Sequence, residues 1–249
     1  MIAVGGRSLF AGLLVAVVVV AQTPANRRQF VTCPIVRDTK TVPCWLAEYK
    51  GELYFLGMQG GVAQEFYPPQ LMHEVLVEGT VSDAPRVCGG LRLSQTKISV
   101  LPELAPACNT MLPAEEGIEG IVVPRLAGIP ATWVRIGGPD QVTIYFDFDN
   151  DFLSLHMTGA LRTLAEGVLK TPAKAVRVAG SRAASRLSGG GVLTERQGIA
   201  ELRALKVVEI LVGLGVPKDV IHVEAPAAAV IPDGINDPWN RNVVVLVQR

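Results

Sequence analysis

The sequence predicts an α+β protein built from two unlike halves. All four cysteines lie in the first half, where apolar and polar residues alternate with the period of β-strands. Residues 140–249 contain no cysteine and alternate strand-like runs with helical periodicity. A segment rich in proline and glycine, residues 113–139, separates the two. We therefore expect a small disulfide-containing β domain at 30–112, a linker or bridging arm at 113–139, and a domain of strands and helices at 140–249.

The composition bounds the class of protein and of partner. The chain has 249 residues, of which 49% are hydrophobic, as expected for a well-packed globular protein. It carries 23 basic and 23 acidic residues, so its formal net charge is zero. Balanced charge gives no electrostatic reason to bind nucleic acid or an anionic membrane surface. We expect no nucleic-acid partner.

The N-terminus has the pattern of a cleaved signal peptide. Residues 1–7 carry a single basic residue and no acidic one, and residues 9–20 form an almost unbroken apolar run. Val19, Val20 and Ala21 place small residues where a signal peptidase cuts, so we expect cleavage after Ala21 and export to the periplasm. The alternative is a retained anchor, but about 12 apolar residues are too few to span a bilayer. We expect no stable membrane span after cleavage.

The cysteines of an exported protein are expected to form disulfides. The four residues are Cys33, Cys44, Cys88 and Cys108, which allow three pairings. Pairing of sequence neighbours, Cys33 with Cys44 and Cys88 with Cys108, is the most economical. A metal site would need short paired spacings such as CxxC, which these cysteines lack, so we expect no metal.

The region between the cysteines predicts about five short strands. Alternating or aromatic-rich runs place them at residues 45–49, 53–58, 75–81, 91–93 and 98–100. Lys50-Gly51 separates the first two runs in the manner of a hairpin turn. The strand count is similar to that of small OB-fold-like barrels. A disulfide-pinned module that supports or presents something is favoured over a binder of oligonucleotides or sugars.

The linker and the second half have a different rhythm. Prolines and glycines interrupt every long element at 113–139, although residues 118–123 and 132–136 each have the composition of a short strand. Strand-like runs and apolar stripes at helical spacing then follow in the order β-α-β-α-β-β, at residues 142–148, 153–168, 175–180, 204–212, 220–224 and 242–247. Gly215 and Pro217 should end the second helix. We expect both helices on one face of a small mixed sheet.

Several runs in this half occur in an order and spacing that resemble a known family. They are IYFDFD at 144–149, QGIAELRA at 197–204, GVP at 215–217 and NRNV at 240–243. Residues 140–249 thus resemble the C-terminal OmpA-like peptidoglycan-binding domain. The resemblance implies a β-α-β-α-β-β sandwich, a periplasmic protein associated with the cell wall or outer membrane, and the peptidoglycan stem peptide as partner.

The resemblance also implies a ligand site, of which one part is missing. In the family, an Asp in the loop after the second strand takes the ammonium of diaminopimelate, and an Arg at the start of the next helix takes a carboxylate. Arg203 matches the Arg, and the family's neighbouring Asn falls on Arg196. The Asp position falls near Ala183, in a loop longer than usual. We expect weak binding or none, unless Glu195 or an aspartate of residues 147–149 fills the acidic position.

Two functional hypotheses follow. In the first, the protein associates non-covalently with peptidoglycan through Arg203, Arg241 and the loop after the second strand, with Ser181, Arg182 and Arg196 as further candidate ligand residues. In the second, the fold is a non-binding scaffold, and its arginines form a surface for an anion or for an envelope protein partner. The arginines of that surface are Arg182, Arg186, Arg196 and Arg203. A peptidoglycan pull-down separates the two hypotheses.

Nothing in the sequence predicts catalysis. GxSxG and HExxH motifs are absent, and residues 188–191 (SGGG) are not followed by the Lys and Ser/Thr of a phosphate-binding loop. We interpret residues 188–191 as a flexible insertion. We expect neither an enzyme nor a bound cofactor.

Overall fold

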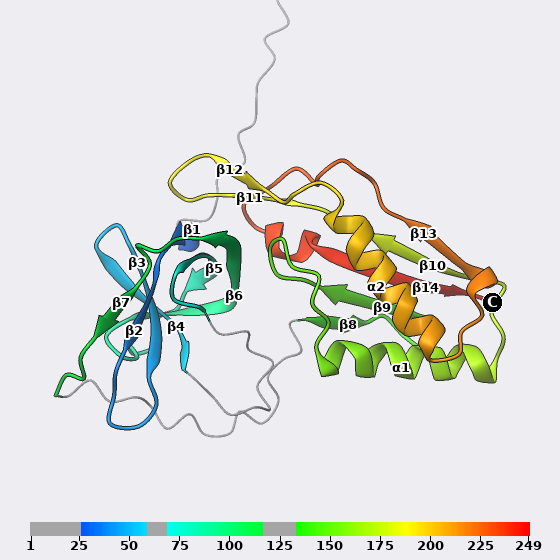
Figure 1. Ribbon diagram of the computed structural model, residues 1–249, viewed down its shortest axis with the longest axis horizontal. Helices are drawn as coiled ribbons and strands as arrows, with labels where there is room; N and C mark the ends of the chain where they lie inside the picture. Colours follow the sequence, from blue (N-terminus) through cyan, green and yellow to red (C-terminus); the bar gives the residue numbers. More distant parts are fainter. Residues whose placement is uncertain (1–25, 59–68, 117–132) are drawn as a thin grey trace, which may run out of the picture.

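The computed structural model describes residues 26–58, 69–116 and 133–249 (Figure 1). These residues form a half-barrel of strands, here called the β half, and a mixed sheet with two helices, here called the C-terminal half. The expected signal peptide at 1–21 and the expected strand at 118–123 lie outside the described residues. In the described ranges, no helix is long and apolar enough to cross a membrane.

The β half contains seven strands, arranged in the order β1-β5-β6-β4-β3-β2-β7. They are β1 (Arg27–Thr32), β2 (Pro34–Arg37), β3 (Cys44–Tyr49), β4 (Glu52–Met58), β5 (His73–Val81), β6 (Leu91–Leu104) and β7 (Thr110–Leu112). The five predicted strands are present, with two of them joined in the long strand β6. The prediction missed β1, β2 and β7, which are short or polar and lack a clear alternation.

The predicted hairpin between β3 and β4 is confirmed. These strands are antiparallel and pair Tyr49 with Glu52. Lys50 and Gly51 between them have φ values of 54° and 77°. Two consecutive positive φ values are typical of the type I′ turn, whose twist matches that of the strands it joins.

The disulfides join Cys33 to Cys108 and Cys44 to Cys88, so the predicted pairing of sequence neighbours is wrong. Strand pairing decides the connectivity. Parallel pairing of β2 with β7 brings Cys33, just before β2, next to Cys108, just before β7, with a Cα–Cα distance of 4.8 Å. Cys44 lies at the start of β3, and its Cα is 6.4 Å from that of Cys88.

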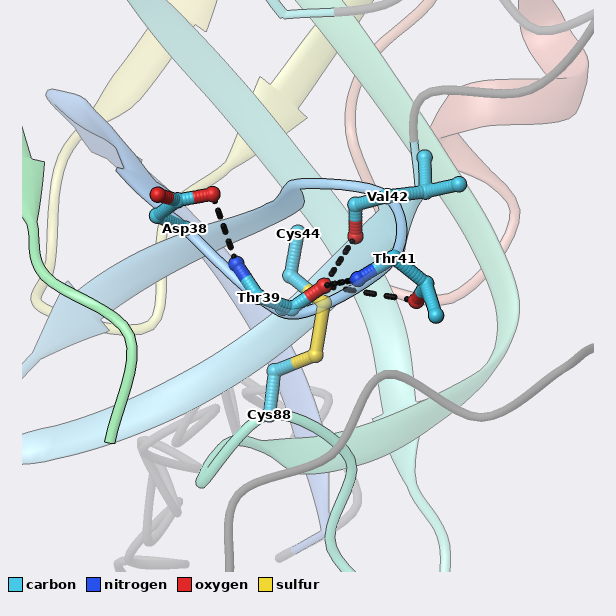
Figure 2. Close-up of a disulfide and its surroundings, with 6 residues drawn as sticks. All are labelled: Asp38, Thr39, Thr41, Val42, Cys44 and Cys88. Atoms are coloured by element: carbon cyan, nitrogen blue, oxygen red, sulfur yellow. Dashed lines mark hydrogen bonds between the residues drawn. A yellow bond between two sulfur atoms is a disulfide. The ribbon is translucent and has the colours of Figure 1, made fainter. Parts of the chain in front are cut away.

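A turn packed on β4 positions Cys88. A Cβ at Gly90 would lie 2.6 Å from the backbone nitrogen of Phe55, so glycine is required for this close approach. The loop before β3 lies over the same disulfide, where the Thr39 hydroxyl donates to the carbonyl of Val42 at 2.9 Å and accepts from the Thr41 amide at 3.1 Å (Figure 2). The core around Cys44 and Cys88 is thus closed by short local turns.

The C-terminal half has the element order expected from periodicity. Its principal elements are β9 (Gln141–Tyr145), α1 (Leu155–Lys170), β10 (Ala175–Gly180), α2 (Ile199–Gly213), β13 (Ile221–Glu224) and β14 (Asn242–Gln248). The sheet order is β13-β10-β14-β9-β8, with β10 and β13 parallel and the other pairs antiparallel. The edge strand β8 (Val134–Ile136) lies within the segment expected as a linker.

One apolar core holds this half together. Alternate residues of β10 and β14, including Val176, Val178 and Val245, are fully buried against Leu161 of α1 and Leu211 of α2. Both helices pack on this one face of the sheet, as predicted (Figure 1). Side chains on the other face of β10 remain partly exposed.

The two halves meet along the outer face of β1, β5 and β6. A small apolar cluster forms there from Leu76 and Leu101 of the β half and Phe148 of the C-terminal half. Beside it, Gln29, Glu78 and Lys97 stand in register on the three strands, and all three are buried. We call this contact the junction.

Candidate functional site

The candidate site lies at one end of the C-terminal sheet. The loop after β9, the loop after β10, the start of α2 and the start of β14 all meet at this end. Figure 1 shows the β half next to the same end. Arg203 on α2 and Arg241 just before β14 both have fully buried side chains here.

Arg203 uses all five of its N–H groups inside the protein. Its guanidinium donates to the Glu195 carboxylate at 2.5 Å and 3.1 Å. The other three hydrogen bonds go to backbone carbonyls, those of Asn150 at 2.8 Å, Asp147 at 2.9 Å and Ser181 at 3.2 Å. A guanidinium has five donors, so none is left for a ligand in this state.

Glu195 supplies a carboxylate where the sequence lacked one. The N–H of Ala183, near which the resemblance places the family's Asp, donates to Glu195 Oε2 at 2.9 Å. The N–H of Asp149 donates to Oε1 at 2.9 Å. Glu195 is 1% exposed. A carboxylate from one of the residues that the sequence left open as alternatives thus lies beside Arg203, and the pair is closed to solvent.

Arg241 is paired with the β half instead. Its guanidinium forms a bidentate pair with Glu78 of β5, with one N–O distance of 3.2 Å, and also donates to the Ser185 hydroxyl at 2.9 Å. Burial alone lowers the pKa of Arg241, but the Glu78 charge and hydrogen bond raise it above its usual value. Both side chains of the pair are fully buried. Arg241 is thus part of the junction.

The other predicted ligand residues do not form one surface. Arg182 donates to the carbonyls of Glu195 at 2.7 Å and Ala227 at 2.6 Å. Arg186 donates to the carbonyl of Pro232 at 3.0 Å. The carbonyl of Ser181 accepts from Arg203, whereas Arg196 is exposed and uses its backbone N–H to bind the Asp149 carboxylate. The structure brings together only Ser181, Arg182 and Arg203, around Glu195.

The segment expected as a flexible insertion, residues 188–191, forms the turn of a hairpin that contacts the β half. Strands β11 (Ala184–Arg186) and β12 (Val192–Thr194) are antiparallel and reach over β1 (Figure 1). At the hairpin turn, the Ser188 N–H donates to the Gln29 carbonyl at 2.7 Å, and the Gln29 N–H donates to the Ser188 hydroxyl at 2.9 Å. The two reciprocal hydrogen bonds fasten the longer loop to β1.

A second ionisable group of the β half is enclosed at the junction. The Lys97 ammonium lies 3.9 Å from the ring centre of Trp133 and 5.3 Å from that of Trp239, and donates to the Phe146 carbonyl at 3.4 Å. Burial lowers the pKa of Lys97 to about 7. Burial likewise raises the pKa of Asp147 to about 6, and within the described residues its Oδ1 has no hydrogen-bond partner.

Sequence reasoning missed the residues of the β half that reach this end of the C-terminal sheet. Glu78, Lys97 and Ser99 lie on strands whose alternation predicts an apolar core face and a solvent-facing polar face. A usable signal was the glutamate within the run VLVEGTV, because a charge inside an apolar strand is usually paired when buried.

Comparison with known proteins finds likeness at the level of structure alone. No protein-family model matches the sequence, and no curated protein matches it. The OmpA-like domain of FopA1 from Francisella tularensis subsp. tularensis SCHU S4 is 21% identical, with 46% of this chain and 80% of that chain covered and a TM-score of 0.34.

Two further solved structures are similar over the same share of the chain. A putative MotB-like protein from Desulfovibrio vulgaris is 16% identical, covering 44% of this chain and 74% of that chain, with a TM-score of 0.35. The cell wall anchor of the T6SS from Pseudomonas aeruginosa is 14% identical, covering 48% and 90%, with a TM-score of 0.34. Values this low do not assign a function, so the OmpA-like family remains a resemblance.

Proposed function

We propose that this chain is a periplasmic cell-envelope protein whose C-terminal half associates non-covalently with peptidoglycan. The same proposal includes a cleaved signal peptide, two domains at 30–112 and 140–249, and no catalytic activity. The observation that carries it is the Glu195–Arg203 pair at the start of α2. A zwitterionic diaminopimelate head needs one acceptor and one donor fork at fixed separation, and this pair provides both groups.

Binding at this pair requires the site to open. Glu195 and Arg203 are both fully occupied by each other and by backbone groups of the same half, so a stem peptide must replace part of a buried ion pair. Removing one partner of such a pair costs about 3–5 kcal/mol, which a ligand recovers only in part. If opening costs half of that, the apparent affinity falls by about 10- to 100-fold. We therefore expect weak association.

A second function, that of a non-binding scaffold, is favoured by a specific observation. Both candidate arginines are saturated or paired by internal carboxylates, and one of those carboxylates comes from the β half. A domain whose candidate ligand arginines are paired with internal carboxylates can serve to position the β half in the envelope. In this case the exposed Arg196 is the only predicted arginine offered freely to a partner among the described residues.

Sedimentation with purified diaminopimelate-type peptidoglycan tests the choice. We expect part of the mature protein to sediment, free diaminopimelate to compete, and Glu195→Gln to weaken binding about 10- to 100-fold, because a charge-assisted hydrogen bond is lost. Glu201→Gln, at an exposed position in the first turn of α2, is the matched control. If the wild-type protein stays in the supernatant, the scaffold function stands and wall association falls.

A further inference from the structure

The β half covers the end of the C-terminal sheet that carries the proposed site. The contacts that cross the junction there include Glu78 to Arg241, Ser99 Oγ accepting from the Phe148 N–H, Lys97 to the Phe146 carbonyl, and Gln29 to Ser188. Phe146 and Phe148 flank Asp147, whose carbonyl accepts from Arg203. The loop that holds Arg203 is therefore itself held by the β half.

Glu78 binds Arg241 in the way an external carboxylate would. Both of its oxygens face the guanidinium, and Ser185 donates its hydroxyl to Oε1 at 2.8 Å. Bidentate pairing with a carboxylate is the geometry for which arginine is best suited. The β half thus places a carboxylate on Arg241, which the sequence predicts as a ligand residue for the wall peptide together with Arg203.

Each half has an apolar core of its own. The C-terminal half has its own large apolar core, and the β half has separate apolar clusters and both disulfides. By contrast, the shared apolar cluster centres on three buried residues, Leu76, Leu101 and Phe148. Contacts that are mainly polar can be exchanged for water, so relative motion of domains is expected at such an interface.

We propose that the β half is an intramolecular cap, in which Glu78 occupies Arg241 and the β11–β12 hairpin fastens the cap, so that peptidoglycan gains the site when the halves separate. This inference rests on the proposed function, because it assigns a regulator to that same site. The docked arrangement is the closed state, and separation frees Arg241 and releases the loop that holds Arg203.

Glu78→Gln tests the cap in the full mature chain. The substitution keeps the shape of the side chain but leaves Arg241 as an unpaired buried charge, which favours separation of the halves. We expect the amides of Phe148 and Ser188, which donate across the junction, to exchange hydrogen about tenfold faster or more. The sedimented fraction with peptidoglycan should rise several-fold. Glu52→Gln, which removes an exposed ion pair with Arg86 in the same half, should change neither.

A milder variant keeps the test decisive if Glu78→Gln folds poorly. Ser188→Ala removes only the acceptor of the Gln29 N–H at an exposed turn, and Ser94→Ala removes an exposed hydrogen bond within the β half as its control. With Ser188→Ala, the amide exchange should become faster and the sedimented fraction should rise, as with Glu78→Gln but by a smaller amount.

The outcomes separate the cap from the proposed function. Faster exchange with unchanged binding overturns the cap and leaves wall association intact. Faster exchange with no binding in any variant overturns wall association, and the cap with it. Unchanged exchange in both junction variants shows that Glu78 and Ser188 do not hold the halves together, which also overturns the cap.

Discussion

Two arginine–glutamate pairs lie at the same end of the C-terminal sheet, and both are fully buried. They differ in how far apart the two partners lie in the sequence and in whether both belong to the same half. Glu195 and Arg203 are 8 residues apart, within one loop and helix start. Glu78 and Arg241 are 163 residues apart and belong to different halves. The first pair belongs to the interior of one half, and the second exists only while the halves are docked.

This difference determines what each pair can do. Arg203 has every donor satisfied within its own half, so exposing it requires the loops of that half to move. Arg241 has a buried Nε without a partner among the described residues. The carboxylate that pairs with it belongs to Glu78 and can leave with the β half. Identical chemistry therefore serves as core structure in one place and as a reversible contact in the other.

Reduction of both disulfides should have the largest effect. The bonds close loops with sequence separations of 75 and 44 residues. Each is expected to stabilise the β half by about 4 kcal/mol. The β half, and with it Glu78, should unfold first in urea with dithiothreitol, while the cysteine-free half keeps its helices and the Glu195–Arg203 pair. Circular dichroism and tryptophan fluorescence would show two transitions. A single cooperative loss of all signals would mean that the halves do not fold separately.

Arg203→Met comes next. It leaves the Glu195 carboxylate buried and unpaired, which should lower the free energy of unfolding of the C-terminal half by about 3–5 kcal/mol. Urea titration followed by the helical circular dichroism signal measures this. Arg196→Met, at an exposed position beside Glu195, is the control and should leave the midpoint unchanged. Adding Glu195→Gln to Arg203→Met should recover part of the loss, since the stranded charge is removed.

Glu78→Gln should cost less, about 2 kcal/mol, although the pair it breaks is just as buried. The reason is that Arg241 can be rehydrated by separation of the halves, which limits the loss to the stability of the junction. Denaturation should also become less cooperative, with a lower m-value. A loss as large as that of Arg203→Met would show that the second pair is core structure too, and the distinction between the pairs would fall.

Periodicity predicted the C-terminal half closely but not its contact with the β half. The stripe on α1 and the alternation on β10 and β14 reflect burial against one core, which is a local pattern. Glu78, Lys97 and Gln29 are also buried, yet polar residues at alternate strand positions are what a solvent-facing side predicts. No local pattern distinguishes water from a polar partner surface. The junction could not be predicted for that reason.

The candidate site was predictable in part for a similar reason. The helix-start arginine follows from its motif, and Glu195 was one of the stated alternatives for the missing acid. The direction of the Arg241 side chain depends on a partner 163 residues away, which no motif encodes. The disulfide pairing failed likewise, because the parallel pairing of β2 with β7 decides it and β7 is only three residues long.

The smallest expected effect is a pH dependence at the junction. Burial lowers the pKa of Lys97 to about 7, below its usual 10.5. Below pH 7 the docked state therefore carries a buried charged ammonium, which lowers its stability. As the pH rises from 7 towards 10.5, Lys97 is neutral in the docked state, and the stability is regained. Asp147 titrates in the opposite sense, because its pKa is raised to about 6 and its contribution is lost as the pH rises through that value.

Stability of the docked state should therefore be lowest between about pH 6 and 7 and rise by roughly 1 kcal/mol between pH 7 and 8.5. The charges that act on Lys97 come from both halves, with Glu78 and Asp147 favouring its protonation and Arg203 and Arg241 opposing it. Urea titration at the two pH values measures the rise. Lys97→Met should abolish it, whereas Lys50→Met, at the exposed hairpin turn, should not. A rise that survives Lys97→Met would assign the titration to a group outside the junction.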